Sequence, residues 1–97
     1  TANLIANGLV LLFAHPDQLN LLRANPDLMP LAVDEMLRCD GPASVIGRVT
    51  TEPVELAGHT VPGGKHIYLA LMAGNRDPEA FPDPDTFRPG RPEASPR

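Results

Sequence analysis

The heptapeptide DEMLRCD, residues 34–40, brings side chains of opposite charge together beside a thiol. Glu35 and Arg38 are three residues apart, a spacing that places two side chains on one face of a helix, and Asp34 lies four residues before Arg38. Cys39, the only cysteine, follows directly. From this stretch alone a solvated ion pair, which stabilises a helix by about 0.2–0.5 kcal/mol, is the favoured interpretation. A catalytic pair and a structural clamp are the alternatives.

The other residue types that commonly carry chemistry form no recognisable motif. His15, His59 and His66 have no metal-ligand spacing, and one cysteine offers neither a Cys-x-x-Cys pair nor an internal disulfide. Gly63 and Gly64 lack the rest of a phosphate-binding loop, and the chain contains no Gly-x-Ser-x-Gly. We therefore expect no metal site made by these residues, no nucleotide binding and no serine hydrolysis.

Composition narrows the class of protein further. The 97 residues suit one small domain with a modest core, and the low aromatic content of 4% with 12 prolines is typical of a piece of a larger core. A net charge of −4 without a basic run argues against nucleic acid as a partner. The apolar run at residues 4–14 is far shorter than the roughly 20 residues that cross a bilayer. No signal peptide opens the chain, so we expect a cytoplasmic protein without a membrane anchor.

Three helices should position the charged heptapeptide. The first is the apolar run at residues 4–14, and HPDQL and NPDLM then read as two helix starts, because proline and aspartate suit a first helical turn. We expect the second helix at residues 16–24 and the third at residues 30–39. In the third helix Leu31, Glu35 and Arg38 form one stripe, so the charged pair continues an apolar line. This pattern favours burial of the two charged side chains.

After the third helix the pattern changes. Alternating residues in VIGRVTTEPVEL, 45–56, and HIYLALMA, 66–73, predict strands, and Pro62-Gly63 between them predicts a type II turn with glycine at its third position. The result is a hairpin or bent β ribbon. Six prolines in residues 75–97 exclude regular structure there. The fold class is therefore α+β: three helices, a β ribbon and an irregular proline-rich tail.

The order of these motifs resembles the closing third of a bacterial cytochrome P-450. A helix with Glu-x-x-Arg, a ribbon with GRVT, and then NRDP and FPDPDTFRPGR follow one another as in that family, and the resemblance covers nearly all of the chain. It implies that residues 1–97 are a partial domain of the mainly α cytochrome P-450 fold, comprising the end of the central helix, the Glu-x-x-Arg helix, the ribbon and the proline-rich region.

The resemblance also implies roles for particular residues. Glu35, Arg38 and Arg91 match a structural ion cluster, with Arg88 as the competitor for the place of Arg91. Arg48 matches a haem-propionate contact, and the alternative for it is an exposed strand arginine. Small and apolar residues match a segment that passes the haem and contacts substrate, although the same residues suit plain packing; they are Ala43, Ser44, Val45 and Ile46.

Two parts of the family's chemistry are missing from this sequence. The chain contains no Phe-Gly-x-Gly motif leading to an iron-ligating cysteine, and Thr1 matches the residue after the family's oxygen-activating threonine. Cys39 follows the Glu-x-x-Arg motif at a helix end, a position that the family does not use for iron. We expect Cys39 to be a free thiol and not a metal ligand.

The function that the resemblance implies belongs to a full-length parent protein. That parent would be a haem-thiolate monooxygenase with haem b, inserting one oxygen atom from O2 into a small organic substrate with electrons from a ferredoxin or flavoprotein. The fragment alone is expected to be inactive and to hold no catalytic residue. The alternative is a non-catalytic interaction module, or a truncated remnant, whose proline-rich tail binds a partner.

Overall fold

The structure, a computed structural model, describes residues 1–94; the last three residues of the predicted proline-rich tail lie outside the described residues. Helix α1, Ala2–Ala14, is largely apolar and ends at His15, whose backbone N–H donates to Leu12 O at 3.1 Å. Pro16 then begins α2, Pro16–Ala24, with the bounds that the sequence predicted. Proline at this position removes only an N–H that has no partner within the helix.

The NPDLM motif starts the third helical segment with a short 3-10 helix, Pro26–Leu28, which continues into α3, Met29–Asp40. The predicted start at Pro30 and end at Cys39 are each one residue inside these bounds. Helix α1 packs on α3 at Gly8, where an added Cβ would lie 2.6 Å from Met36 Sδ. A side chain at residue 8 would therefore force the Met36 side chain to move.

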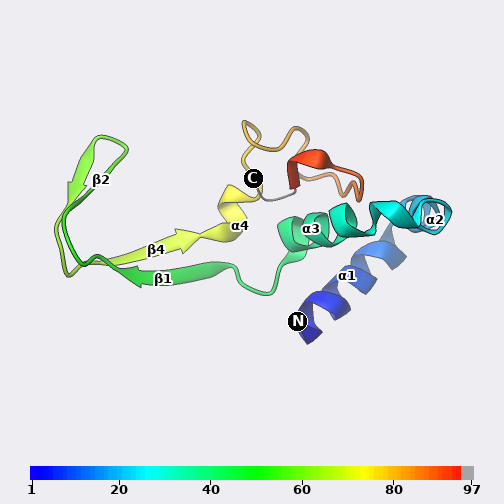
Figure 1. The fold of residues 1–97 in the computed structure, drawn as a ribbon, viewed down its shortest axis with the longest axis horizontal. Coiled ribbons are helices and arrows are strands. Elements are labelled where there is room, and N and C mark those ends of the chain that lie inside the picture. Colours follow the sequence, from blue (N-terminus) through cyan, green and yellow to red (C-terminus); the bar gives the residue numbers. More distant parts are fainter. Residues whose placement is uncertain (95–97) are drawn as a thin grey trace.

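A small core lies between the helices and the proline-rich tail. Its buried members come from α1, α2, α3 and the tail: Leu12, Leu22, Ala32, Met36, Cys39 and Phe87. Phe87 anchors the tail there, with its ring centroid 5.3 Å from that of His15. The rest of the tail has no regular structure until the 3-10 helix Pro92–Ala94, and it runs beside α3 in Figure 1.

The predicted ribbon divides into two antiparallel pairs. Strand β1, Val45–Val49, pairs with β4, His66–Ala70, and β2, Val54–Leu56, pairs with β3, His59–Val61. The β1–β4 pair extends away from the helices, and the β2–β3 hairpin lies at its far end (Figure 1). The strand predicted over residues 45–56 is thus interrupted, and β3 lies where the sequence predicted only a connection.

Two local predictions about the ribbon are wrong. Residues 71–73, the end of the strand predicted over residues 66–73, belong instead to a short helix, α4, Leu71–Gly74. The predicted left-handed residue of the turn was Gly63, whereas the positive φ of 76° belongs to Gly64, one residue later. The physical reason is that the backbone N–H of Gly64 and the carbonyl of Lys65 both bond to Thr50, which places the turn.

Thr50 marks the bend between the two strand pairs. It is buried, its hydroxyl donates to Pro62 O at 2.7 Å and accepts the Lys65 N–H at 2.9 Å. One side chain therefore holds the end of β1 to the turn that leads into β4. Among residues 1–94, no helix is both long and apolar enough to cross a lipid bilayer.

Candidate functional site

An ion cluster joins α3 to the proline-rich tail. Arg38 Nε lies 2.7 Å from Glu35 Oε2 and Arg38 Nη2 lies 2.8 Å from Glu35 Oε1, so one guanidinium contacts both carboxylate oxygens. Arg91 Nε, from the tail, reaches Glu35 Oε1 at 3.1 Å. Glu35 is 0% exposed and the two arginines are each 3% exposed. The structure thus brings Glu35, Arg38 and Arg91 together, and the pair that the heptapeptide alone suggested to be solvated is buried.

Glu35 is satisfied by more than the two arginine side chains. Its Oε1 also accepts the backbone N–H of Arg88 at 3.0 Å. Burial raises the pKa of Glu35, but hydrogen bonds from Arg38, from the Arg88 backbone and from Arg91 outweigh burial and lower it below 4.5. Glu35 is therefore ionised at neutral pH. Its contribution to stability is present above pH 4.5 and is lost as the pH falls through the lowered pKa.

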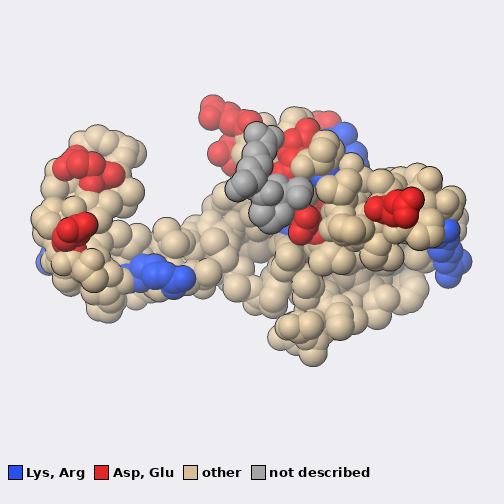
Figure 2. Space-filling view, viewed as in Figure 1, with Lys and Arg blue, Asp and Glu red and all other residues tan. Residues whose placement is uncertain are grey.

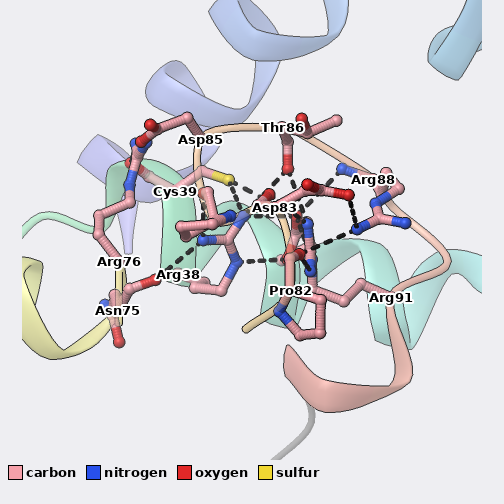
Figure 3. A network of polar contacts seen from close by, with 12 residues as sticks. Arg38, Cys39, Asn75, Arg76, Pro82, Asp83, Asp85, Thr86, Arg88 and Arg91 are labelled. Carbon is pink, nitrogen blue, oxygen red and sulfur yellow. Dashed lines mark hydrogen bonds and ion pairs between the residues drawn. The ribbon is translucent and has the colours of Figure 1, made fainter. Parts of the chain in front are cut away.

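The remaining donors of both arginines bind backbone carbonyls (Figure 3). Arg38 donates to carbonyl oxygens of Asn75, Pro84 and Thr86, and Arg91 donates to those of Pro82, Asp83 and Thr86. A proline-rich segment cannot hold itself by a ladder of backbone hydrogen bonds, because proline has no N–H and fixes φ. The two guanidinium groups provide the bonds that such a ladder would otherwise make.

Arg88 has a different part in the cluster. Its guanidinium is 46% exposed and lies 3.7 Å from Asp83, an exposed carboxylate, while only its backbone N–H reaches Glu35. Of the two arginines that FRPGRP offers, Arg91 therefore supplies the buried guanidinium. The backbone contact of Arg88 was not predicted, because residue type gives no signal for a main-chain donor.

The ring of Phe81 also went unpredicted. It lies 5.4 Å from the guanidinium carbon of Arg38, which packs over its face.

Cys39 belongs to the same cluster. Its Sγ lies 3.0 Å from Arg38 Nη2 and 3.6 Å from Glu35 Oε1, and the residue is 5% exposed. Burial and the nearby Glu35 charge raise the pKa of the thiol to about 11, despite the opposing effect of Arg38. The bond to Glu35, opposed by burial, raises the pKa of Arg38. Cys39 is thus a protonated, buried thiol, and residues 1–94 contain no group of side chains that could hold a metal ion.

Arg48, Val45 and Ile46 lie on β1, and Ala43 and Ser44 lie on the connection that leads into it. Ala43, Ser44 and Val45 are exposed and Ile46 is half-buried, and residues 1–94 enclose no cavity beside them. Arg48 is exposed, and its Nη1 donates to the carbonyl of Gly47 at 2.9 Å.

The Arg48 environment is suited to a haem carboxylate. A guanidinium whose other N–H groups face solvent can donate two parallel hydrogen bonds to a carboxylate. Ile46 shares the strand face of Arg48 because the two are separated by one residue. This part of the chain therefore offers a cation and an apolar neighbour side by side, which fits the edge of a haem.

Arg76 is a further residue that sequence reasoning did not single out. Its Nη2 donates to Cys39 O at 2.9 Å and its Nη1 lies 2.9 Å from Asp85 Oδ1. The available signal was its place in NRDP, next to the proline-rich tail.

Comparisons with known proteins agree on one family. The Cytochrome P-450 family profile matches residues 2–95. The chain is 46% identical over 87 residues to the biotin biosynthesis cytochrome P-450 of Bacillus subtilis (strain 168), covering 90% of the chain and 22% of that protein. It is 49% identical over 88 residues to the cytochrome P-450 monooxygenase PikC of Streptomyces venezuelae, covering 90% of the chain and 21% of that protein. The chain thus spans little more than a fifth of these relatives.

A solved structure gives the same result for the fold. The crystal structure of P450BioI in complex with hexadec-9Z-enoic acid ligated acyl carrier protein superposes with a TM-score of 0.84 and 44% identity, over 93% of this chain and 24% of that one. The predicted α+β arrangement of helices followed by small antiparallel sheets is therefore confirmed. Family profile, sequence relatives and structure together show that this chain belongs to the cytochrome P-450 family.

Proposed function

We propose that this chain is part of a haem-thiolate monooxygenase that inserts one oxygen atom from O2 into a small organic substrate. The observation that carries the proposal is the family match over residues 2–95. We further propose that the parent protein receives electrons from a ferredoxin or flavoprotein and works in the cytoplasm. The chain itself contributes positioning elements.

Within that function the ion cluster is a structural clamp. Glu35, Arg38 and Arg91 are buried, and their polar atoms are engaged with one another and with tail carbonyls. A carboxylate that is 0% exposed is closed to a substrate, and removing either arginine would leave a buried charge without its partner. The clamp therefore fixes the tail against α3 and takes no part in proton transfer.

Arg48 is the residue of this chain proposed to hold the cofactor. Haem b, when bound, supplies the redox chemistry at its iron, and the protein supplies binding and orientation. The guanidinium of Arg48 would hold a propionate group. Residues 43–46, which lead into the same strand and begin it, would form part of the wall that orients the substrate and excludes water. We propose that the axial thiolate comes from a loop outside these 97 residues, because Cys39 is enclosed by the clamp.

The test uses the full-length parent protein with Arg48→Ala. The wild-type protein should bind haem and, when reduced under carbon monoxide, show a thiolate-type absorption band. Arg48→Ala should transfer its haem to apomyoglobin faster, because one charge-assisted contact to the propionate is lost. The matched control is Arg23→Ala, which removes an exposed arginine from the last turn of α2.

Two results would contradict the proposal. A parent protein that neither binds haem nor shows the band would favour the non-catalytic module. Haem transfer from Arg48→Ala at the rate of Arg23→Ala would remove Arg48 from the haem site while leaving the monooxygenase assignment in place.

A further inference from the structure

The NRDP motif faces the C-terminal end of α3 through a reciprocal pair of contacts. Arg38 of α3 donates from Nη1 to the carbonyl of Asn75 at 2.9 Å, and Arg76 donates from Nη2 to the carbonyl of Cys39 at 2.9 Å. Each arginine side chain thus binds the backbone carbonyl of the residue next to the other arginine. The two segments, residues 38–39 and 75–76, are therefore tied at two points.

A second contact of Arg76 reaches the tail. Its Nη1 lies 2.9 Å from Asp85 Oδ1, and Asp85 stands between Pro84 and Thr86, the two residues whose carbonyls Arg38 binds. Figure 3 shows Arg76 and Arg38 beside each other at this junction. Arg76 Nε is buried without a hydrogen-bond partner among residues 1–94, so the two terminal nitrogens carry the attachment.

These contacts fix the base of the ribbon. Residue 76 follows α4, which follows β4 directly, and β4 pairs with β1 in a register that sets Val45 opposite Ala70 and Arg48 opposite Ile67. The covalent connection from α3 holds the β1 side of the base, and Arg76, together with the bond from Arg38 to Asn75 O, holds the β4 side. A two-stranded ribbon that extends away from the helices, as in Figure 1, depends on both attachments for its direction.

The contacts of Arg76 govern geometry more than stability. Its ion pair with Asp85 is largely solvated, with side chains 37% and 89% exposed, and exposed pairs contribute little to folding. The contact with Cys39 O is different in kind. A carbonyl in the last turn of a helix lacks a partner within the helix, and a cation there also complements the helix dipole. Loss of Arg76 should loosen the base of the ribbon without unfolding α3, because the bond from Arg38 to Asn75 O remains.

We infer that Arg76 is a positioning residue that sets the direction of the β1–β4 ribbon against α3 and thereby the place of Arg48. The inference rests on the proposed function, because the place of Arg48 matters only if it holds a haem propionate. Arg76 would hold neither haem nor substrate itself. It acts through β4 and β1.

A double-mutant cycle in the full-length protein tests the inference. Arg76→Gln should transfer haem to apomyoglobin about tenfold faster than wild type, the equivalent of one charge-assisted hydrogen bond. Arg76→Lys should give an intermediate rate, because an ammonium can hold one of the two partners. In the Arg48→Ala background, Arg76→Gln should add little, since the group that it positions is already gone. The urea midpoint of Arg76→Gln should match that of Arg88→Gln, a control at a half-exposed arginine of the same tail.

Several results would overturn the inference. One is a rate of haem transfer in Arg76→Gln equal to that of the wild type. Another is a double variant whose rate increase equals the product of the two single increases, since independent effects indicate a general loss of structure. A wild-type parent without haem would overturn the proposed function itself, which distinguishes the two failures. If Arg76→Gln does not fold, Asp85→Asn, which removes one arm of the attachment, gives the same comparison.

Discussion

At the scale of the residue, the buried carboxylate of Glu35 is stable because each of its oxygens has donors. Oε2 accepts from Arg38 Nε, and Oε1 accepts from Arg38 Nη2, the Arg88 N–H and Arg91 Nε. Burial of a charge is tolerated under this condition, and it becomes strongly unfavourable when one partner is removed. The neighbouring Asp34 is half-buried and has no ion pair among residues 1–94.

We expect Glu35→Ala in the full-length protein to lower the free energy of unfolding by about 3–5 kcal/mol, because two buried guanidinium groups lose their counter-charge. Asp34→Ala should cost about 0.5 kcal/mol or less, because Asp34 makes no ion pair among residues 1–94 that its removal would break. Urea unfolding and the yield of haem-loaded protein measure the difference. Equal damage from the two neighbours, or a nearly silent Glu35→Ala, would contradict the clamp.

The two tail arginines provide a check on the same prediction. Arg91→Ala should resemble Glu35→Ala, since it removes a buried guanidinium and its bonds to tail carbonyls. Arg88→Ala should be mild, because its backbone N–H to Glu35 survives the change. Damage at Arg88 with Arg91 tolerated would show that the third member of the cluster has been assigned to the wrong arginine.

The sequence predicted some contacts of the ion cluster and not others, for physical reasons. The spacing of Glu35 and Arg38 predicts that they meet, but helix spacing carries no information about what covers the pair. Arg91 came from the resemblance, since an irregular tail has no period that would aim a side chain. The backbone donor of Arg88 and the attachment by Arg76 depend on tertiary geometry alone.

Cys39 gives the cluster a pH dependence on the alkaline side. Its folded pKa is raised from 9.0 to about 11, so the folded state keeps a proton that the unfolded state releases. The stability that the thiol contributes is complete below pH 9 and is lost as the pH rises to about 11. The difference in unfolding free energy between wild type and Cys39→Ala should therefore be constant below pH 9 and shrink above it. A difference that does not change with pH would show that the thiol is not held protonated.

At the scale of the element, the helices were easier to predict than the strands. Proline at the starts of α2 and the 3-10 helix marks a boundary by local chemistry, and the α2 bounds were correct. The three-residue strands β2 and β3 are too short to show a two-fold period. The residue pattern of HIYLALMA gives no sign that its second half leaves the strand. There α4 begins, and the Met72 N–H donates to the carbonyl of Ser44 at 3.3 Å.

Thr50 offers a test of how the ribbon bends. Thr50→Val keeps the side-chain shape but removes the hydroxyl that accepts from Lys65 and donates to Pro62. Amide hydrogen exchange at residues 63–65 of the turn should then rise about tenfold, corresponding to one lost hydrogen bond. Thr51→Val, at the exposed neighbour, is the matched control and should leave exchange unchanged. Equal exchange in the two variants would mean that the backbone bonds at residue 50 hold the turn without the side chain.

At the scale of the whole molecule, much apolar surface is uncovered. Helix α1 exposes Ile5, Leu9, Val10 and Phe13 by 47–69%, and the ribbon exposes Val45, Val49, Tyr68 and Leu69 by 44–72%. Acidic side chains gather over the tail and the β2–β3 hairpin in Figure 2. Large exposed apolar surfaces normally contact other protein. The chain spans 22% and 21% of the length of two of its relatives.

The isolated 97-residue chain should therefore show no haem-thiolate spectrum, whether it folds or not. If it folds, the Cys39 thiol is 5% exposed and lies between Arg38 and Glu35, so haem iron cannot reach it. If it does not fold, no loop orients the sulfur, and a haem thiolate requires backbone donors around it. The measurement is reconstitution with haem, reduction and addition of carbon monoxide, with Cys39→Ser as the control. A stable thiolate-type band that disappears in Cys39→Ser would show that this cysteine can ligate iron and that the buried position assigned to it is wrong.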